Sequence, residues 1–206
     1  MLEEKWPNNS VELCGTLRGR PEYSHSSREE EYYIFMLDVE RLSGTVDTIK
    51  IVARESTMSE LIIEEREKVI IKGELRSFNN KSGIGNRLII TVFAQVIELG
   101  YGEDRNEVVL CGIVCKLPNL RRTPMGREIC DMMLAVNRRY GRSDYIPCIA
   151  WGQNAQLAGQ WHIGSVIQLT GRIQSRKYIK INDGQSEEKT VYEVSATTAE
   201  LINNDE

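Results

Sequence analysis

The chain has 206 residues, of which 41% are hydrophobic and 27% are charged, a balance typical of a folded globular protein and not of a disordered one. No run of eighteen apolar residues occurs, and the first ten residues are acidic and polar where a secretory signal is basic and then apolar. We therefore expect a cytoplasmic protein with no membrane partner. The net charge of −4 excludes a protein that binds polyanions through its overall charge.

The two halves of the chain differ in charge. Residues 1–103 hold 13 basic and 18 acidic side chains, a net charge of −5 (13 − 18), whereas residues 104–206 hold 13 basic and 12 acidic side chains, a net charge of +1 (13 − 12). Phosphate contacts need lysine and arginine. If either half binds nucleic acid, the second half is therefore favoured.

An internal repeat relates the two halves. The segment VELCGTLRGRP, which starts at Val11, matches VVLCGIVCKLP, which starts at Val108, at a shift of 97 residues (108 − 11). The same shift aligns FMLDVER with MMLAVNR and TIKIVA with YIPCIA; VIIKGELRS matches IQLTGRIQS at 98, and TVFAQVIEL matches EVSATTAEL at 102. A shared register over separated segments indicates two copies of one domain. We place these domains at residues 1–102 and 103–206.

Each copy is predicted to form short strands with alternating polar and apolar residues. In chain order, the strands of copy one are expected at 11–17, 32–41, 47–53, 68–77 and 87–99, with a helix in STMSELIIEE (56–65) after the third. Those of copy two are expected at 108–115, 129–138, 144–151, 165–176 and 190–201, with a helix in GQNAQLAGQW (152–161) whose Leu157, Ala158 and Trp161 face inward. Five strands with one helix after the third predict an all-β chain of two tandem OB-folds, which are five-stranded Greek-key barrels; other small barrels share these counts.

Copy two resembles the bacterial single-stranded DNA-binding protein family over about Asn106–Leu201. The resemblance is carried by NEVVLCGIVCKLPNLRRTPMG, LAVNRRYGRSDYIPCIAW, GSVIQLTGRIQSRKY and VYEVSATTAELI. It implies an OB-fold that binds single-stranded DNA by stacking bases on aromatic rings, in the replication, recombination or repair of nucleoid DNA. It also implies an assembly that presents four such folds, so a chain with two copies is expected to form a homodimer.

The family places its stacking aromatics at four positions of the domain. Carried over to copy two, these positions are Tyr140, Tyr145, Trp151 and Tyr178. The alternation of a strand over 144–151 supports two of them independently. Ile146, Cys148 and Ala150 fill one face with apolar side chains, which leaves Tyr145 and Trp151 on the opposite face.

Basic residues surround these aromatics in the sequence. The candidates for nucleic-acid binding are Arg121, Arg122, Arg138, Arg172, Arg176 and Lys177. A basic groove with aromatic platforms suits sequence-independent binding of single strands, because phosphates repeat and every base has a π-face.

Copy one has no aromatic residue at the four corresponding positions. The repeat places Ser43, Thr48, Arg54 and Asn80 there, and the loop SSREEEYY is acidic where copy two has LRRTPMG. Negative charge repels phosphate. We therefore expect copy one to keep the fold and a role in assembly, while copy two supplies most of the base stacking.

The sequence indicates a binding protein and not an enzyme. It has only two histidines, His25 and His162, neither of them in a catalytic constellation, and no glycine-rich phosphate-binding motif. Its five cysteines are odd in number and suggest free thiols. Cys111 and Cys115 are about 13 Å apart on a strand, too far to share a zinc ion with bonds of about 2.3 Å. We expect no catalytic residues, cofactor or metal.

Two other functions remain open at this point. One is a degenerate OB-fold that serves as a protein-interaction module of a replication or primosome assembly, and the other is an RNA-binding OB protein, because nothing in the sequence reads a 2′-hydroxyl. Members of the family usually carry an acidic C-terminal tail that recruits enzymes. This sequence ends at INNDE after the last predicted strand, so we do not expect recruitment through such a tail.

Overall fold

The computed structural model describes residues 8–58, 65–80, 86–138, 141–182 and 185–202. The chain forms two compact units. The N-terminal unit comprises residues 10–76 and 91–107, and the C-terminal unit comprises residues 1–9, 77–90 and 108–206. The tip of a hairpin from the first half of the sequence, residues 77–90, thus packs with the second half. Domains at 1–102 and 103–206, which follow the repeat, stay a prediction.

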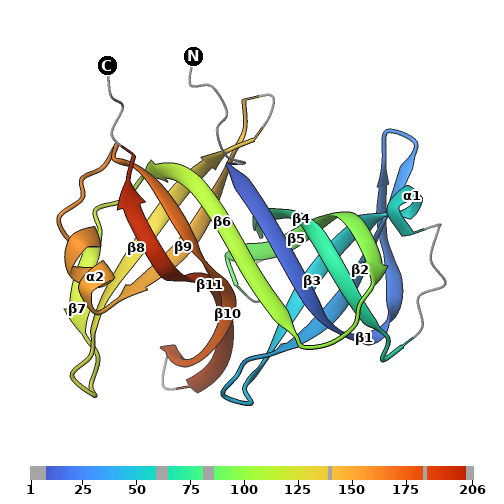
Figure 1. Ribbon diagram of the computed structural model, residues 1–206, viewed down its shortest axis with the longest axis horizontal. Helices are drawn as coiled ribbons and strands as arrows, with labels where there is room; N and C mark the ends of the chain where they lie inside the picture. The colour runs from blue at the N-terminus through green and yellow to red at the C-terminus, as the bar shows by residue number, and fades with distance from the viewer. Residues whose placement is uncertain (1–7, 59–64, 81–85, 139–140, 183–184, 203–206) are drawn as a thin grey trace. The chain divides into compact units, whose positions relative to one another are not determined.

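The first barrel is built from five strands and one short helix (Figure 1). These elements are β1 (Asn9–Ser27), β2 (Glu30–Glu40), β3 (Val46–Arg54), α1 (Glu55–Met58), β4 (Lys68–Asn79) and β5 (Leu88–Leu99). The strand order is β2-β3-β5-β4-β1, and a further pairing of β1 with β2 closes the barrel. β3 and β5 run parallel, whereas β1 pairs with β2 and β4 in antiparallel fashion. Apolar side chains at alternate strand positions, such as Leu37 and Ile51, fill the interior.

The second barrel repeats this topology. Its elements are β6 (Arg105–Val114), β7 (Asn119–Arg122), β8 (Glu128–Asn137), β9 (Ser143–Trp151), α2 (Gln153–Ala158), β10 (Val166–Asn182) and β11 (Gln185–Leu201). The strand order is β6-β10-β11-β9-β8, closed by pairing of β6 with β8, and β7 adds to the outer side of β8. β9 and β11 form the parallel pair. The prediction of an all-β chain with two five-stranded Greek-key barrels is confirmed.

All ten predicted strands are present, with differences at their ends. β1 continues to Ser27, and the hairpin of β10 and β11 extends to Asn182 and Gln185. The short strand β7 was not predicted, because all four of its residues are exposed and carry no apolar alternation. These extensions lie outside the core and pair through backbone hydrogen bonds, so their side chains need not alternate between apolar and polar, and the sequence does not predict them.

The helices are shorter than predicted. α2 has six residues, and its buried side chains are Ala155 and Ala158. The inward placement of Ala158 and Trp161 is confirmed, but that of Leu157 is wrong, since this side chain is 52% exposed. Of the helix predicted at 56–65, α1 forms only Glu55–Met58, and residues 59–64 lie outside the described part of the chain. No helix among the described residues is long and apolar enough to cross a membrane.

A glycine in the fourth strand of each barrel marks a close approach of two backbones. A Cβ atom on Gly73 would lie 2.1 Å from the carbonyl oxygen of Phe93, and one on Gly171 would lie 2.2 Å from that of Ser195. The repeat shift of 98 residues (171 − 73) relates these two glycines. The glycine shared by KGEL in copy one and TGRI in copy two is therefore required by the packing of the barrel.

Candidate nucleic-acid interface

One face of β9 carries two exposed aromatic rings. Tyr145 is 50% exposed and Trp151 is 36% exposed, whereas Ile146, Cys148 and Ala150 are buried in the barrel. The predicted orientation of this strand is thus confirmed. The side chain of Ile149 points to the same face of β9 as the two rings but is only 3% exposed, so neighbouring elements cover the strand at this position.

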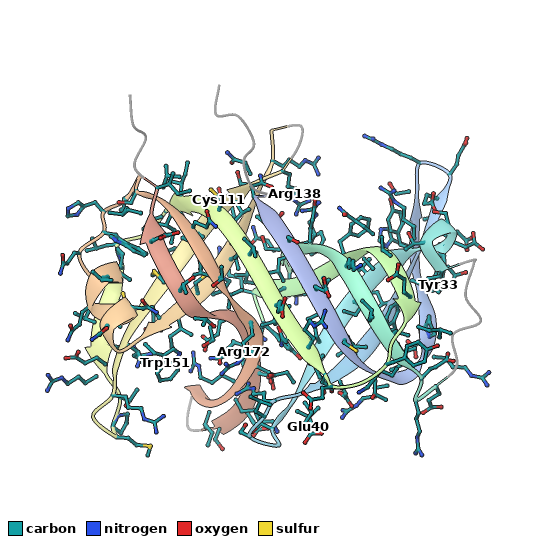
Figure 2. The ribbon with its side chains drawn as sticks, viewed as in Figure 1. Tyr33, Glu40, Cys111, Arg138, Trp151 and Arg172 are labelled. Atoms are coloured by element: carbon teal, nitrogen blue, oxygen red, sulfur yellow. The ribbon has the colours of Figure 1, made fainter. Side chains whose placement is uncertain are left out.

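Hydrogen bonds hold both ends of this face. The indole Nε1 of Trp151 donates to Oγ of Ser195 on β11 at 3.1 Å, which fixes the ring against the next strand. The backbone N–H of Tyr145 donates to Oγ of Ser77 at 2.8 Å. The first bond restricts the Trp151 ring before any ligand binds, which lowers the entropic cost of stacking, and the second holds the backbone at Tyr145. Figure 2 shows Trp151 and Arg138 toward opposite ends of β9.

A hollow of about 370 Å³ lies on this side of the barrel. Pro147, which shares the outer face of β9 with Tyr145 and Trp151, contributes to its wall, whereas the two rings do not line it. The wall also includes Met133 and two arginines, Arg121 and Arg176. Its volume falls in the range of roughly 300–1,000 Å³ that is typical of pockets for small ligands.

Most cations around the hollow form ion pairs within the protein. The shortest N–O distances are 2.6 Å for Arg121–Asp131, 3.0 Å for Arg122–Glu128, 3.5 Å for Arg176–Glu193 and 2.9 Å for Lys177–Glu188. Exposed ion pairs contribute only about 0–1 kcal/mol, so a phosphate can replace the carboxylate partner of Arg122 or Lys177; Glu193, the partner of Arg176, is only 7% exposed. Arg172 on β10 is exposed and forms no ion pair with any residue that the structure describes.

The same contacts set the protonation of this surface. The hydrogen bond to the Asp131 carboxylate raises the pKa of Arg121. Hydrogen bonds from Gln156 and then from Arg122 lower the pKa of Glu128. Because both shifts favour the charged forms, these groups stay ionised around neutral pH.

Arg138 has a different environment from the other candidates. Its guanidinium donates to both carboxylate oxygens of Asp144, at 2.6 and 2.5 Å, and Asp144 is fully buried. Arg41 and Asp47 form the same bidentate pair in the first barrel, at 2.6 and 2.7 Å, with Asp47 also fully buried. The repeat shift of 97 residues relates the two pairs. The spacing Arg-x5-Asp in both copies was a signal for this pair that sequence reasoning missed.

The hairpin tip at 77–90 adds contacts that were not predicted. The backbone N–H of Ser77 donates to Asp144 at 2.6 Å, and Arg138 donates to the carbonyl of Ser77 at 3.3 Å. The Arg138 guanidinium lies 5.7 Å from the centre of the Phe78 ring, which is 48% exposed. This tip therefore places a third exposed ring beside the start of β9 in the C-terminal unit.

The remaining predicted aromatics are only partly described. Tyr140 lies outside the described residues. The backbone of Tyr178 belongs to β10, where it pairs with Lys189 of β11, and its side chain lies outside the described part of the structure.

The cysteines are free thiols. Burial raises the pKa of Cys130 to about 11 and also raises that of Cys148. Among the described residues, no group of three or more His, Cys, Asp or Glu side chains is arranged to hold a metal ion.

Comparison with known proteins identifies the second barrel. The model of the single-strand binding protein family matches residues 105–202. Single-stranded DNA-binding protein 3 of Streptococcus agalactiae is 34% identical over 104 residues, which cover 47% of this chain and 73% of that protein. The chain belongs to the single-strand binding protein family. Single-stranded DNA-binding protein 1 of Lactococcus lactis is 36% identical over 104 residues, covering 47% of this chain and 67% of the relative.

A solved structure shows the same fold over nearly the whole chain. The single-stranded DNA-binding protein from Thermus aquaticus matches with a TM-score of 0.78 and 21% identity, covering 96% of this chain and 94% of the other. The resemblance predicted from the sequence is confirmed, and residues 1–104 lie outside the family match. Membership in a family of binding proteins also confirms that the chain is not an enzyme.

Proposed function

We propose that this protein binds single-stranded DNA without base specificity through the outer face of β9 and the adjoining parts of β7 and β10. The observation that carries this proposal is the pair of exposed rings, Tyr145 and Trp151, on the face of β9 whose Pro147 lines a hollow together with Arg121 and Arg176. Rings stack on bases of any sequence, and arginines bind the repeating phosphates. The curated relatives named as single-stranded DNA-binding proteins support this function.

The residues divide into two roles. Trp151 and Tyr145 stack bases, as do Tyr140 and Tyr178 by family position. Phosphates bind the cations of β7 and β10, which are Arg121, Arg122, Arg172, Arg176 and Lys177. Arg138 acts indirectly, because its contacts with Asp144 and Ser77 hold the start of β9, and with it Tyr145, in place.

The assembly and the biological role extend this proposal. A homodimer presents four barrels, of which the second one in each chain supplies most of the base stacking. Coating of single strands protects them during replication, recombination or repair. Light scattering of the purified chain tests the dimer, for which we expect twice the chain mass of 23.5 kDa; a monomer would contradict it.

The class of ligand is tested by fluorescence anisotropy with labelled oligonucleotides. Oligo-dT, a mixed-sequence DNA of equal length, the matching RNA and the DNA duplex are compared at two or more salt concentrations. We expect similar affinities for the two single-stranded DNAs, weaker binding of duplex, and a log K against log salt slope of about −0.7 per phosphate contacted. Tighter binding of RNA would favour an RNA-binding protein. No binding of either strand would favour a protein-interaction module.

A further inference from the structure

The N-terminal unit carries a row of alternating aromatic and basic side chains on four neighbouring strands. This aromatic–arginine row consists of Tyr32 on β2, Arg54 on β3, Phe93 on β5 and Arg76 on β4, in the order of the sheet. The guanidinium carbons of Arg54 and Arg76 lie 5.4 and 5.9 Å from the centre of the Phe93 ring. The rings of Tyr32 and Phe93 are 6.4 Å apart.

The row faces away from the barrel interior. Ala53, Leu75, Val92 and Ala94, which flank its members along the strands, are at most 1% exposed. Successive side chains of a strand point to opposite faces. Tyr32 pairs directly with Arg54 across β2 and β3, so it belongs to the same outer face. The rings and guanidinium groups therefore line the outside of the sheet.

The repeat places this row where the second barrel carries Trp151. Arg54 corresponds to Trp151 at a shift of 97 residues, and Phe93 corresponds to Ser195 at a shift of 102. In the second barrel, the indole on the third strand reaches the serine on the fifth at 3.1 Å. In the first barrel, the guanidinium on the third strand lies over the ring on the fifth. The aromatic residue of this pair thus lies on the third strand in the second barrel and on the fifth strand in the first barrel.

We propose that the aromatic–arginine row is a second site for single-stranded DNA, on the half of the chain that lacks the family's aromatic positions. The inference rests on the proposed function of the protein. Bases stack on guanidinium planes as well as on aromatic rings. Arg54 is exposed, is held against Phe93, and forms no ion pair with a carboxylate among the described residues. A phosphate or a base therefore meets an ordered cation without displacing a carboxylate partner.

Neighbouring groups set the extent and strength of this site. His25 on β1 stacks on Tyr32 with ring centres 4.7 Å apart and planes 4° apart, which extends the aromatic surface. Acidic side chains lie close by: Glu74 forms an ion pair with Arg76, and Glu30 accepts a hydrogen bond from Ser56 at 2.9 Å. These negative charges repel phosphate, so the row binds more weakly than the face of β9.

The experiment uses the full chain and fluorescein-labelled oligo-dT, in the Trp151→Ala background that weakens the stronger site by one stacked base. We expect Phe93→Leu and Arg54→Ala each to weaken the remaining affinity by roughly fivefold to tenfold, as expected for loss of one stacked base. Arg54→Lys keeps the charge but not the plane, so it should lose part of this affinity. Arg20→Ala, an exposed arginine outside the row, is the matched control and should change nothing.

The outcomes separate this inference from the proposed function. Failure of the wild-type chain to bind oligo-dT would overturn both. If the wild-type chain binds oligo-dT and Trp151→Ala abolishes this binding, only the second site is overturned. The same holds if Phe93→Leu and Arg54→Ala leave the residual binding of Trp151→Ala unchanged, provided that these variants keep a wild-type circular dichroism spectrum. The latter result would instead suit a protein partner on this face.

Discussion

The buried pair of Arg138 and Asp144 offers a decisive test of whether Arg138 acts on the fold or on phosphate. Asp144 is fully buried and Arg138 is 21% exposed. In Arg138→Met, the carboxylate loses its charged partner in a low dielectric. Breaking a buried ion pair by removing one partner costs about 3–5 kcal/mol. The N–H of Ser77 still donates to Asp144 at 2.6 Å, so we expect a loss of about 2–4 kcal/mol in the free energy of unfolding.

Urea denaturation followed by circular dichroism measures this loss. Arg41→Met is the matched control, because it removes the cation from the equivalent pair with the fully buried Asp47, and we expect a similar cost. Replacing both partners, as in Arg138→Met with Asp144→Leu, should recover much of the stability, since no buried charge is left unpaired. A loss below about 0.5 kcal/mol, the size of a surface ion pair, together with weaker DNA binding, would refute this reasoning and assign Arg138 to phosphate contact.

Two further predictions concern the barrel interior. Gly171→Ala should destabilise the protein by about 1–3 kcal/mol, because the new Cβ would meet the carbonyl oxygen of Ser195 at 2.2 Å; an unchanged denaturation midpoint would contradict the close approach. Iodoacetamide at pH 8 should modify the partly exposed Cys115 before Cys130 and Cys148: burial raises the pKa of all three thiols, but only the latter two are buried from the reagent. Mass spectrometry of native and urea-treated protein checks the order, and equal rates for the three thiols in the native state would be inconsistent with this burial.

Much of the fold and part of the site were predictable from the sequence. The alternation in β9 placed Tyr145 and Trp151 on the outer face, and the repeat predicted two barrels with the same strand order. These inferences depend on local periodicity and on self-similarity, both of which a single sequence contains. The resemblance to the family added the four aromatic positions.

The features that sequence reasoning missed depend on contacts between distant segments. Phe93 and Arg54 are 39 residues apart (93 − 54) and meet only because β3 and β5 are neighbours in the sheet. Ser77 reaches Asp144 across 67 residues because the hairpin tip packs with the C-terminal unit. No local pattern encodes such pairs. The Arg–Asp pair is the exception among the missed contacts, because aligning the two copies shows the same Arg-x5-Asp spacing in both.

The central claim is that the face of β9 stacks the bases of single-stranded DNA, and the fluorescence of Trp151 tests it most directly. Oligo-dT is titrated into the wild-type chain, into Trp151→Phe and into Trp161→Phe, which removes an indole that is only 6% exposed. We expect quenching in the wild type and in Trp161→Phe, and most of it to vanish in Trp151→Phe. In Trp151→Ala, the loss of one stack should weaken binding at this face by about 1–3 kcal/mol, while Tyr145 and the cations of β7 and β10 remain. Unchanged affinity in Trp151→Ala, with quenching that persists in Trp151→Phe, would contradict the account.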